Sequence, residues 1–338
     1  MRRAPTMKDV AAEAGVSLKT VSRVMNGVTT VDEALAARVI EAVDRLGFVT
    51  NLAASGLRRA DRRSHQIGAV MVADPLSPFL GTLLGPIQSV AMARGSVLLA
   101  STVTKDSGLE QDFVHAFVAR RVDGLVLAPS SPNQAYLAGL VGSLPIVCVD
   151  RPAAGVSTDL VMATNYSGGF EAVSHLIRRG HRRIGYIGDL EAYVNTTERF
   201  TGYLGAMHAA GLSVDPAWIR HGVRTSEGAE QATHELLAQP EPPTALFTSQ
   251  SILTIGMLTA LKELGLQTAI AHVGFDDLPL AELLHPALTV IAQDSATMGT
   301  RTAELLFQRI DEPGGTPVRV DVSTRLIARG SGELPPRD

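Results

Sequence analysis

A chain of 338 residues is too long for one compact core and predicts two or three domains. Hydrophobic residues make up 45% of the chain and aromatic residues only 4%, so we expect the Ala, Val and Leu packing that is typical of α/β layers. The single cysteine, Cys148, excludes a disulfide framework and fits a reducing cytoplasm. The net charge is −4, yet basic residues outnumber acidic ones in residues 1–65 and the reverse holds beyond them, which favours nucleic-acid binding at one end.

The stretch TMKDVAAEAGVSLKTVSRVMNG, near the N-terminus, has the spacing of a helix-turn-helix. Residues 7–14 form an amphipathic segment, and Gly15 supplies the tight turn that two steeply packed helices need. Ser17 can cap a second helix, which places Val21 and Val24 inward. The outward face carries side chains of the types that contact base edges and phosphates, namely Leu18, Lys19, Ser22, Arg23 and Asn26. An ordinary αα-hairpin on a protein surface is the alternative.

Residues 31–47 predict a third helix, which Asp32 can cap and Gly47 can end. Three short helices make the smallest helix-turn-helix domain, and we place this domain at residues 1–50. Residues 51–65 begin as a short, weak helix and end in a polar, basic linker. Such a hinge can fold when it binds.

From Ile67 onward, short apolar runs alternate with longer helical stretches. The expected strands are IGAVMVA, SVLLAST, DGLVLAP, PIVCVD, RIGYIGD, TALFTS and IAHVGFD. The expected helices are Phe79 to Arg94, Leu109 to Arg121, Gly168 to Arg179, Thr197 to Ala210, Glu227 to Ala238 and Ile252 to Leu264. Apolar strands that are each followed by a helix indicate parallel sheets covered on both faces. The number of strands predicts two doubly wound subdomains, with a ligand cleft at the carboxyl ends of the strands.

Residues 242–261 form an uncharged run that is long enough to cross a membrane. The run contains prolines and several polar residues, so we predict a buried strand followed by a helix. Arg2 and Arg3 precede no apolar segment of the kind that a signal peptide has. We therefore expect a cytoplasmic protein without membrane association.

Sequence motifs for catalysis are missing: the chain has no Walker loop, GxGxxG, HExxH or GxSxG motif and no paired cysteines. We expect no cofactor, no metal and no catalytic residue. His175 and His181, in the segment HLIRRGHRRIG, are predicted to be structural or solvated. Asp276 and Asp277 follow a strand and could serve in acid–base chemistry, but no nucleophile accompanies them, so ligand binding is favoured.

Several segments occur in an order that resembles the LacI/GalR family of bacterial transcription regulators. These segments are DVAAEAGVSLKTVSRVMNG, RRVDGLVLAP, PIVCVDRP, HLIRRGHRRIGYIGD, ERFTGYLGAM and VGFDDLPLAELLHPALTVIAQD, spread over about residues 6–330. The resemblance implies an oligomer whose heads bind a pseudo-palindromic double-stranded DNA operator. It also implies a core similar to periplasmic sugar-binding proteins, which binds a small, carbohydrate-like effector. Because only a short tail without a heptad pattern follows residue 330, the sequence favours a homodimer over a coiled-coil tetramer, without deciding between the two.

The resemblance assigns DNA contacts to two segments of the chain. They are Thr6, Ser17, Leu18, Lys19, Thr20, Ser22, Arg23 and Asn26 in the head, and Ala54, Leu57 and Arg58 in the hinge. Leu18 and Lys19 stand at the variable pair with which the family selects its operator sequence. Leu57 would wedge into a base step of the minor groove, and the alternative is a linker leucine that packs on the core.

The resemblance also implies effector contacts in the core, at Phe79, Asp150, Arg199, Gln250 and Asp276. Carboxylates and a guanidinium suit a polyhydroxylated ligand, because ionised groups make strong hydrogen bonds to hydroxyls. Three departures from the family pattern occur: Gln250 and Ser251 replace a common Asn-Asp, Ser295 replaces an aromatic residue, and Thr50 replaces a hinge proline. The first two departures leave the identity of the effector open.

The expected fold is an N-terminal all-α helix-turn-helix domain followed by an α/β core of two doubly wound parallel-sheet subdomains, like that of periplasmic binding proteins. The core is expected at residues 66–335, with subdomain one at about 66–162 and 292–321 and subdomain two at about 163–291 and 322–331. We expect a repressor whose operator affinity changes when an effector shifts the balance between two subdomain arrangements. A solute-binding protein would share the core but not the head, and a sugar-modifying enzyme would need catalytic groups that the sequence lacks.

Overall fold

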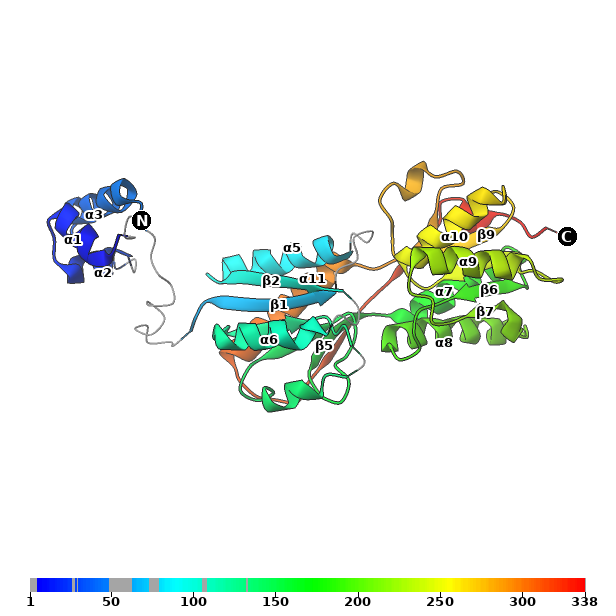
Figure 1. The fold of residues 1–338 in the computed structure, drawn as a ribbon, viewed down its shortest axis with the longest axis horizontal. Helices are drawn as coiled ribbons and strands as arrows, with labels where there is room; N and C mark the ends of the chain where they lie inside the picture. Colours follow the sequence, from blue (N-terminus) through cyan, green and yellow to red (C-terminus); the bar gives the residue numbers. More distant parts are fainter. Residues whose placement is uncertain are drawn as a thin grey trace. The chain divides into compact units, whose positions relative to one another are not determined.

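The computed structural model describes residues 5–25, 28, 30–48, 63–72, 79–104, 108–131 and 133–337. The chain divides into two compact units, Met1–Ser64 and His65–Asp338. Figure 1 shows a helical first unit, and a second unit in which sheets are covered by helices. We describe each unit by itself.

The first unit, which we call the head, consists of α1 (Met7–Ala14), α2 (Leu18–Met25) and α3 (Glu33–Leu46). Their inward faces form a small core of five buried side chains, namely Val10, Ala14, Val21, Val39 and Ala42. The predicted helices and the inward position of Val21 are confirmed, and Val24 packs against this core while half-buried.

Local sequence signals begin and end these helices as predicted. The Ser17 hydroxyl accepts a hydrogen bond from the Thr20 amide at 3.1 Å, and the Asp32 carboxylate caps α3. Gly15 and Gly47 both have a φ of 61°, the left-handed conformation that closes a helix and favours glycine.

The second unit, which we call the core, contains two sheets of six strands each. In subdomain one the order is β11-β5-β4-β3-β1-β2. Its strands are β1 (Gln66–Val72), β2 (Val97–Val103), β3 (Gly124–Leu127), β4 (Ile146–Val149), β5 (Asp159–Ala163) and β11 (Arg319–Val322), and all of its pairings are parallel. The first five follow the doubly wound order 2-1-3-4-5, which places a topological switch between β1 and β3.

Subdomain two repeats this arrangement in the order β12-β10-β9-β8-β6-β7. Its strands are β6 (Ile184–Ile187), β7 (Ile219–Arg220), β8 (Ala245–Thr248), β9 (Ala271–Phe275), β10 (Thr289–Ala292) and β12 (Arg325–Ile327). The β12 strand pairs antiparallel with β10, and the other pairs are parallel. A second switch point therefore lies between β6 and β8.

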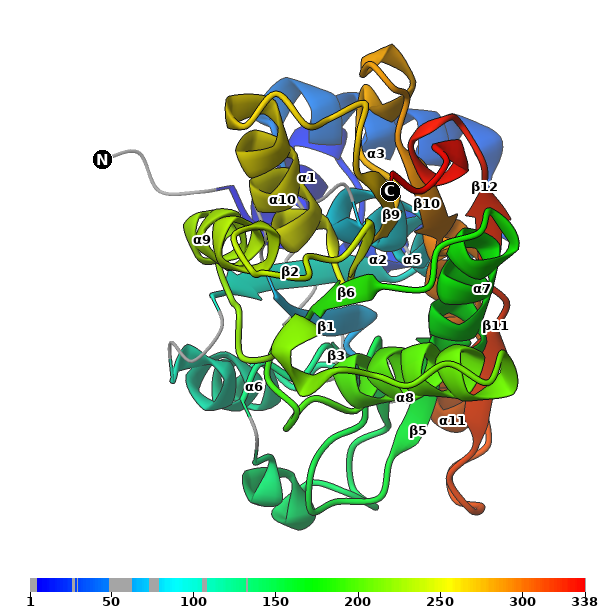
Figure 2. The same ribbon diagram turned by 90° about the vertical axis from the view of Figure 1, so that its right-hand side faces the viewer.

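Helices cover both faces of each sheet. Subdomain one is covered by α5 (Phe79–Ala93), α6 (Leu109–Ala119) and α11 (Ser295–Asp311). Subdomain two is covered by α7 (Asn165–Arg178), α8 (Val194–Ala209), α9 (Ser226–Leu237) and α10 (Ser251–Glu263), and short 3-10 turns include η3 (Ala281–Leu283) and η4 (Ser331–Glu333). Figure 2 shows α7 and α8 on one side of the second sheet and α9 and α10 on the other. Each layer closes over its own apolar cluster, and subdomain two has a further, smaller cluster around Leu288 and Val290.

The chain crosses between the subdomains three times, after β5, after β10 and after β11. The strands β5, β10 and β11 end at Ala163, Ala292 and Val322, each one residue beyond the boundary between the subdomains that the sequence predicts. Helices α7 and α8 each begin three residues before the expected Gly168 and Thr197, because their first turns bury polar side chains that carry no apolar periodicity.

The uncharged run at residues 242–261 forms β8 and most of α10, as predicted. Within the described part of the chain, no helix is both long and apolar enough to cross a membrane.

Candidate DNA-contacting face and ligand cleft

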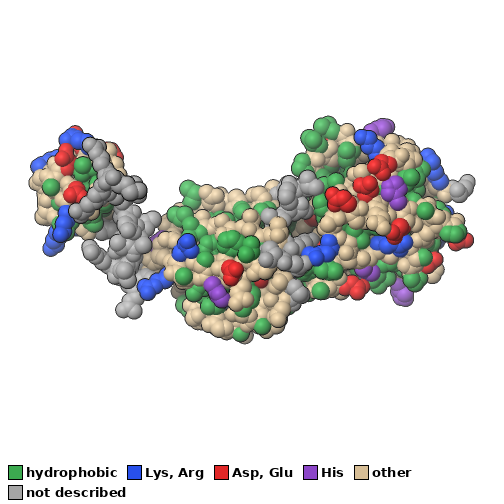
Figure 3. Space-filling view, in the orientation of Figure 1, with side chains coloured by type: hydrophobic (Ala, Val, Ile, Leu, Met, Phe, Trp, Pro, Cys, Tyr) green, Lys and Arg blue, Asp and Glu red, His purple; other side chains and the backbone are tan. Residues whose placement is uncertain are grey.

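The candidate DNA contacts of the head lie at helix starts and on the outer face of α2. Leu18 is 43% exposed, and Lys19 and Arg23 are also exposed. Because residues three and four apart on a helix are neighbours, the side chains of residues 18, 19, 22 and 23 share one surface. Figure 3 shows Lys and Arg side chains on the surface of this unit.

Thr6 and Thr20 have structural partners inside the head. The Thr6 hydroxyl donates to the Asp9 carboxylate at 2.6 Å and accepts from the Asp9 amide, which forms a capping box at the start of α1. The Thr20 hydroxyl lies 2.9 Å from that of Ser17. These bonds fix the first turns of α1 and α2, where amide groups can face an anion.

Within the head, the Arg23 Nη2 donates to the Thr30 hydroxyl at 2.5 Å. Ser22 is half-buried on the same helix. Asn26 and the hinge candidates Ala54, Leu57 and Arg58 lie outside the described residues.

In the core, the five candidate effector contacts converge on one cavity between the two subdomains. Phe79, Asp150, Arg199, Gln250 and Asp276 line this cavity, which has a volume of about 80 Å³. A neighbouring cavity of about 250 Å³ shares two of these residues, Phe79 and Asp276. We call the two cavities together the cleft. Its residues come from segments at the carboxyl ends of the strands and from the first turns of helices α5, α8 and α10.

Asp276 and Arg199 form the buried charged part of the cleft on subdomain two. Arg199 is 4% exposed; its Nε donates to Asn165 at 2.8 Å, and its Nη1 to the Ser249 carbonyl at 2.6 Å. Its guanidinium also lies 3.7 Å from the Phe275 ring centroid. Burial raises the pKa of Asp276, while the Arg199 charge and a hydrogen bond from Gln293 oppose that rise. The Gln293 bond measures 2.5 Å.

Asp150 is the corresponding carboxylate of subdomain one, directly after β4. It accepts from Arg151 Nη2 at 3.1 Å and from Asn195 Nδ2 at 3.2 Å. Arg151 is 8% exposed and lines the cavity, and its Nη1 has no hydrogen-bond partner among the described residues. Asp150 and Asp276 have φ angles of 70° and 78°, so both cleft carboxylates lie on sparsely populated, left-handed backbone.

Polar residues that line the smaller cavity but are absent from the sequence-based prediction include Arg151, Asn195 and Gln293. Two had a signal in the sequence. Arg151 directly follows Asp150, and Asn195 lies one helical turn before Arg199, so each adjoins a predicted contact. Gln250, which was predicted, reaches the Asp189 carboxylate at 3.3 Å.

Comparison with known proteins covers both units. A model of bacterial regulatory proteins of the lacI family matches residues 6–51, and a periplasmic binding protein-like domain matches residues 173–332. The chain is 30% identical to the HTH-type transcriptional repressor CytR of Escherichia coli strain K12, over 97% of this chain and 96% of CytR. This chain belongs to the lacI family.

Two solved structures show the fold of this lacI-family chain along nearly its whole length. The Lac repressor dimer bound to operator and the anti-inducer ONPF is 25% identical, with a TM-score of 0.84, and the match covers 98% of this chain and 99% of that one. The transcriptional regulator CelR in complex with cellobiose is 30% identical, with a TM-score of 0.72, over 97% and 99% of the two chains. The expected fold class is thereby confirmed.

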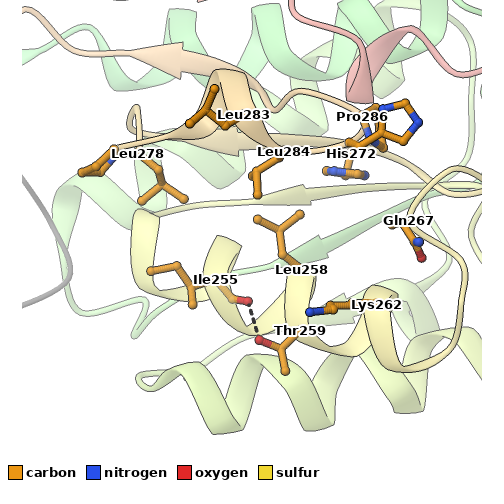
Figure 4. Close-up of a pocket in the computed structure, with 12 residues that line it drawn as sticks. Ile255, Leu258, Thr259, Lys262, Gln267, His272, Leu278, Leu283, Leu284 and Pro286 are labelled. Carbon is orange, nitrogen blue, oxygen red and sulfur yellow. Dashed lines mark hydrogen bonds between the residues drawn. The ribbon is translucent and has the colours of Figure 1, made fainter.

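This lacI-family core has a second hollow, of about 670 Å³, between α10 and the segment after β9 (Figure 4). Ile255, Leu258, Leu283 and Leu284 give it an apolar lining. The adjoining turn projects into solvent, since Leu280 is 71% and Leu283 78% exposed.

The histidines of this lacI-family core lie outside the cleft. His175 binds the Glu333 carboxylate at 2.5 Å, and His181 bridges the Thr244 hydroxyl and the Leu334 carbonyl, both at 2.9 Å. These bonds tie the C-terminal segment to subdomain two, which confirms a structural role for both. His272 is buried beneath the second hollow, and burial lowers its pKa to about 4.

Among the described residues, one group has metal-ligand spacing: Glu230, His234 and Glu263, whose ligand atoms lie within 4.8 Å of one another. His234 and Glu263 are largely exposed and pair at 3.1 Å, as in an ordinary surface contact between α9 and α10.

Proposed function

We propose that the protein is a sequence-specific transcriptional repressor. Its head binds a pseudo-palindromic DNA operator, and a small sugar-like effector in the cleft changes its operator affinity. The observation that carries the proposal is the match to the repressor CytR along almost the whole of both chains, which includes the head and the cleft-bearing core. It is a cytoplasmic binding protein and performs no catalysis. The functional parts are residues 1–50 for DNA, 51–65 for the hinge and 66–335 for effector binding and dimerisation.

The α2 surface supports the DNA-binding part of the proposal. Lys19 can donate to guanine and Leu18 can contact a thymine methyl in a major groove. Thr6, Ser17, Thr20, Ser22 and Arg23 then contact phosphates or base edges around them. Asn26, Ala54, Leu57 and Arg58 stay predictions that rest on the sequence.

Two opposite-charge pairs support a neutral, polyhydroxylated effector. Asp150 is paired with Arg151, and Asp276 lies in the field of Arg199, so the cleft offers strong donors and acceptors without a large net charge. Phe79 adds an apolar surface. The complex of the similar regulator CelR with cellobiose supports a carbohydrate effector.

The face around the second hollow supports a homodimer. It carries a projection, the turn with Leu280 and Leu283, beside a hollow with an apolar lining. A two-fold interface requires such self-complementarity, because the projection of each copy must enter the hollow of the other. Lys262 lines the hollow and Glu282 lies on the turn, so the two-fold contact also brings opposite charges together. The Lac repressor structure is likewise a dimer.

Subdomain one also has an exposed apolar area. Figure 3 shows hydrophobic side chains gathered on its visible face, and Met92 of α5 is 64% and Val97 of β2 50% exposed. In Figure 1, α5 and α10 both lie on the upper side of the core. We propose that this whole side faces the second copy.

Sedimentation equilibrium of the full-length protein tests the dimer. The double variant Leu283→Asp, Leu284→Asp should sediment as a monomer at concentrations where the wild type is a dimer, because it places charges in an apolar contact. Val141→Asp, at an exposed apolar position of subdomain one, is the matched control and should stay dimeric. A dimeric double variant would refute this interface.

Operator binding tests the repressor function itself. The purified protein is titrated with DNA from its own upstream region, at two salt concentrations and with a panel of sugars. We expect specific binding that weakens steeply with salt and changes with one sugar. Arg23→Ala should weaken binding by about 10- to 100-fold, whereas Arg45→Ala, at an exposed arginine of α3, should leave it near the wild-type value. Sugar binding without specific DNA binding would instead favour a solute-binding protein.

A further inference from the structure

Tyr193 of subdomain two reaches across to subdomain one, where it contacts Arg151, a residue that lines the cleft. It lies at the start of α8, is 4% exposed, and donates its hydroxyl proton to the Ser130 carbonyl at 3.2 Å. The Arg151 guanidinium lies 4.5 Å from the centroid of its ring. Ser130 follows β3 and Arg151 follows β4, so a single side chain joins two strand ends of the opposite subdomain.

Subdomain one holds the Ser130 segment in place with a buried carboxylate. Glu110 is 3% exposed and accepts hydrogen bonds from both the amide and the hydroxyl of Ser130, the latter at 2.7 Å. The same carboxylate accepts from Tyr136 at 2.7 Å and from Gln134 at 3.2 Å. Such a satisfied network makes the acceptor for Tyr193 a rigid one.

Arg151 is also held from both subdomains. Its Nε and Nη2 bind the Asp150 carboxylate at 3.3 and 3.1 Å, and Asp150 in turn accepts from Asn195 of α8. Tyr193 and Asn195, two residues apart on subdomain two, therefore contact the two members of one ion pair on subdomain one. The orientation of this pair depends on contacts that exist only when the subdomains are closed.

We infer that Tyr193 is a positioning residue that clasps the two subdomains together and, through Arg151, sets the direction of the Asp150 carboxylate. We call Tyr193, Ser130, Arg151, Asp150 and Asn195 the clasp. The clasp holds Arg151, which lines the cavity and whose buried Nη1 has no hydrogen-bond partner among the described residues. The inference rests on the proposed function, because Asp150 is a proposed effector contact. Beyond that function, the inference names a set of side chains that holds the two subdomains closed even when no effector is bound.

Double electron–electron resonance, which measures the distance between spin labels on the two subdomains, tests whether the clasp holds them together. Cysteines replace exposed Gln111 on α6 and Glu227 on α9 of the full-length protein, and both are spin-labelled. The native Cys148 is buried, which raises its pKa to about 11, so it labels slowly. No effector and no DNA are present, so a failure of the proposed function would leave this result unaffected.

Tyr193→Phe should move the main distance by several ångströms or replace its single population with a broad one, and Arg151→Met should do the same. Tyr203→Phe is the matched control, because it removes a buried tyrosine hydroxyl that donates to the Ile184 carbonyl at 2.8 Å inside subdomain two. Its distance distribution should match that of the wild type. Unchanged distributions in both clasp variants, each with a wild-type circular dichroism spectrum, would overturn the inference.

Discussion

In the head, the candidate residues of α2 are exposed or half-buried, and their helices begin and end at caps supplied by neighbours in the sequence. In the core, Arg199 and Arg151 are almost fully buried. The hydrogen-bond partners of Arg199 lie 34 and 50 residues away in the chain, whereas Arg151 binds its direct neighbour Asp150. The head thus presents side chains on a locally determined scaffold, whereas the core assembles its cleft from strand ends of two sheets. Perturbations of the two regions should therefore have separable consequences, and the variants below test that separation.

The largest effect is expected from Val21→Asp, which places a charge in the small core of the head. Val21 is completely buried, and an unpaired buried charge costs several kcal/mol in free energy of unfolding, about what a domain of this size has available. We expect the head to unfold and specific operator binding to fall more than about 100-fold, while the thermal transition of the core stays in place. Val28→Asp, at an exposed valine of the head, is the control. Wild-type operator affinity in Val21→Asp would contradict the division into two units.

Arg199→Met should have the opposite effect: it should damage the core and leave the head unchanged. The substitution leaves the Asn165 side chain, the Ser249 carbonyl and the Asp276 carboxylate without their cation, which should destabilise the core by about 2–4 kcal/mol. Sugar binding in calorimetry should be lost, while the head retains its helical signal and its own unfolding transition. Arg178→Met, at an exposed arginine of α7, should change neither property. Undiminished sugar affinity in Arg199→Met would remove Arg199 from the effector site.

The stability of the core should depend on pH because of His272, which has no counterpart in the head. Its folded pKa, about 4, lies below the ordinary value of 6.5, so the unfolded chain takes up a proton first as the pH falls. Stability is therefore retained above pH 6.5 and declines between pH 6.5 and 4, by at most about 3 kcal/mol.

In His272→Asn, which keeps a donor for the Ile270 carbonyl, the decline in stability between pH 6.5 and 4 should be smaller than in the wild type. Urea unfolding of the core at several pH values measures the slope, and exposed His208→Asn serves as the control. If stability declines with pH equally in the wild type and in His272→Asn, the protonation of His272 does not cause the decline.

The smallest effect is expected at the first cap of the head. Thr6→Ala removes the capping box of α1 and should lower the stability of the head by about 1 kcal/mol, whereas Thr6→Ser should keep most of it. Thermal unfolding of the head by circular dichroism measures the difference, and the transition of the core should not move. If Thr6→Ser is as unstable as Thr6→Ala, the hydroxyl is not what stabilises the helix.

Sequence patterns predicted most of the elements whose signals are local. Helices α1 and α6, and the strands with uninterrupted apolar runs such as β1 and β4, lie within one or two residues of their predicted positions. The strands β5, β7, β10, β11 and β12 and the helix α11 were not predicted. The polar edge strands β11 and β12 gain their conformation only by pairing with a preformed sheet, so their own residues give little indication of it.

The residues of the cleft likewise fall into some that the sequence predicted and others that only the folded chain brings there. The five predicted effector contacts line one cavity. Gln293 joins them there, and Tyr193 contacts the cavity-lining Arg151, only through the crossing of the chain between two sheets. No spacing in the sequence places Tyr193 against Ser130, which lies 63 residues earlier. Arg151 and Asn195 adjoin predicted contacts, but only the folded chain shows that they meet at Asp150.

The sequence by itself determined the caps and turns of the head, the apolar strands of the core and the residue types in its cleft, because these follow from interactions between near neighbours and from burial periodicity. The tertiary structure alone decided which strand ends face each other across the cleft, which polar side chains are buried there and which apolar side chains stay exposed for a partner. Those outcomes depend on contacts between residues far apart in the chain. Such contacts exist only after both sheets have formed and the three crossings have brought them together.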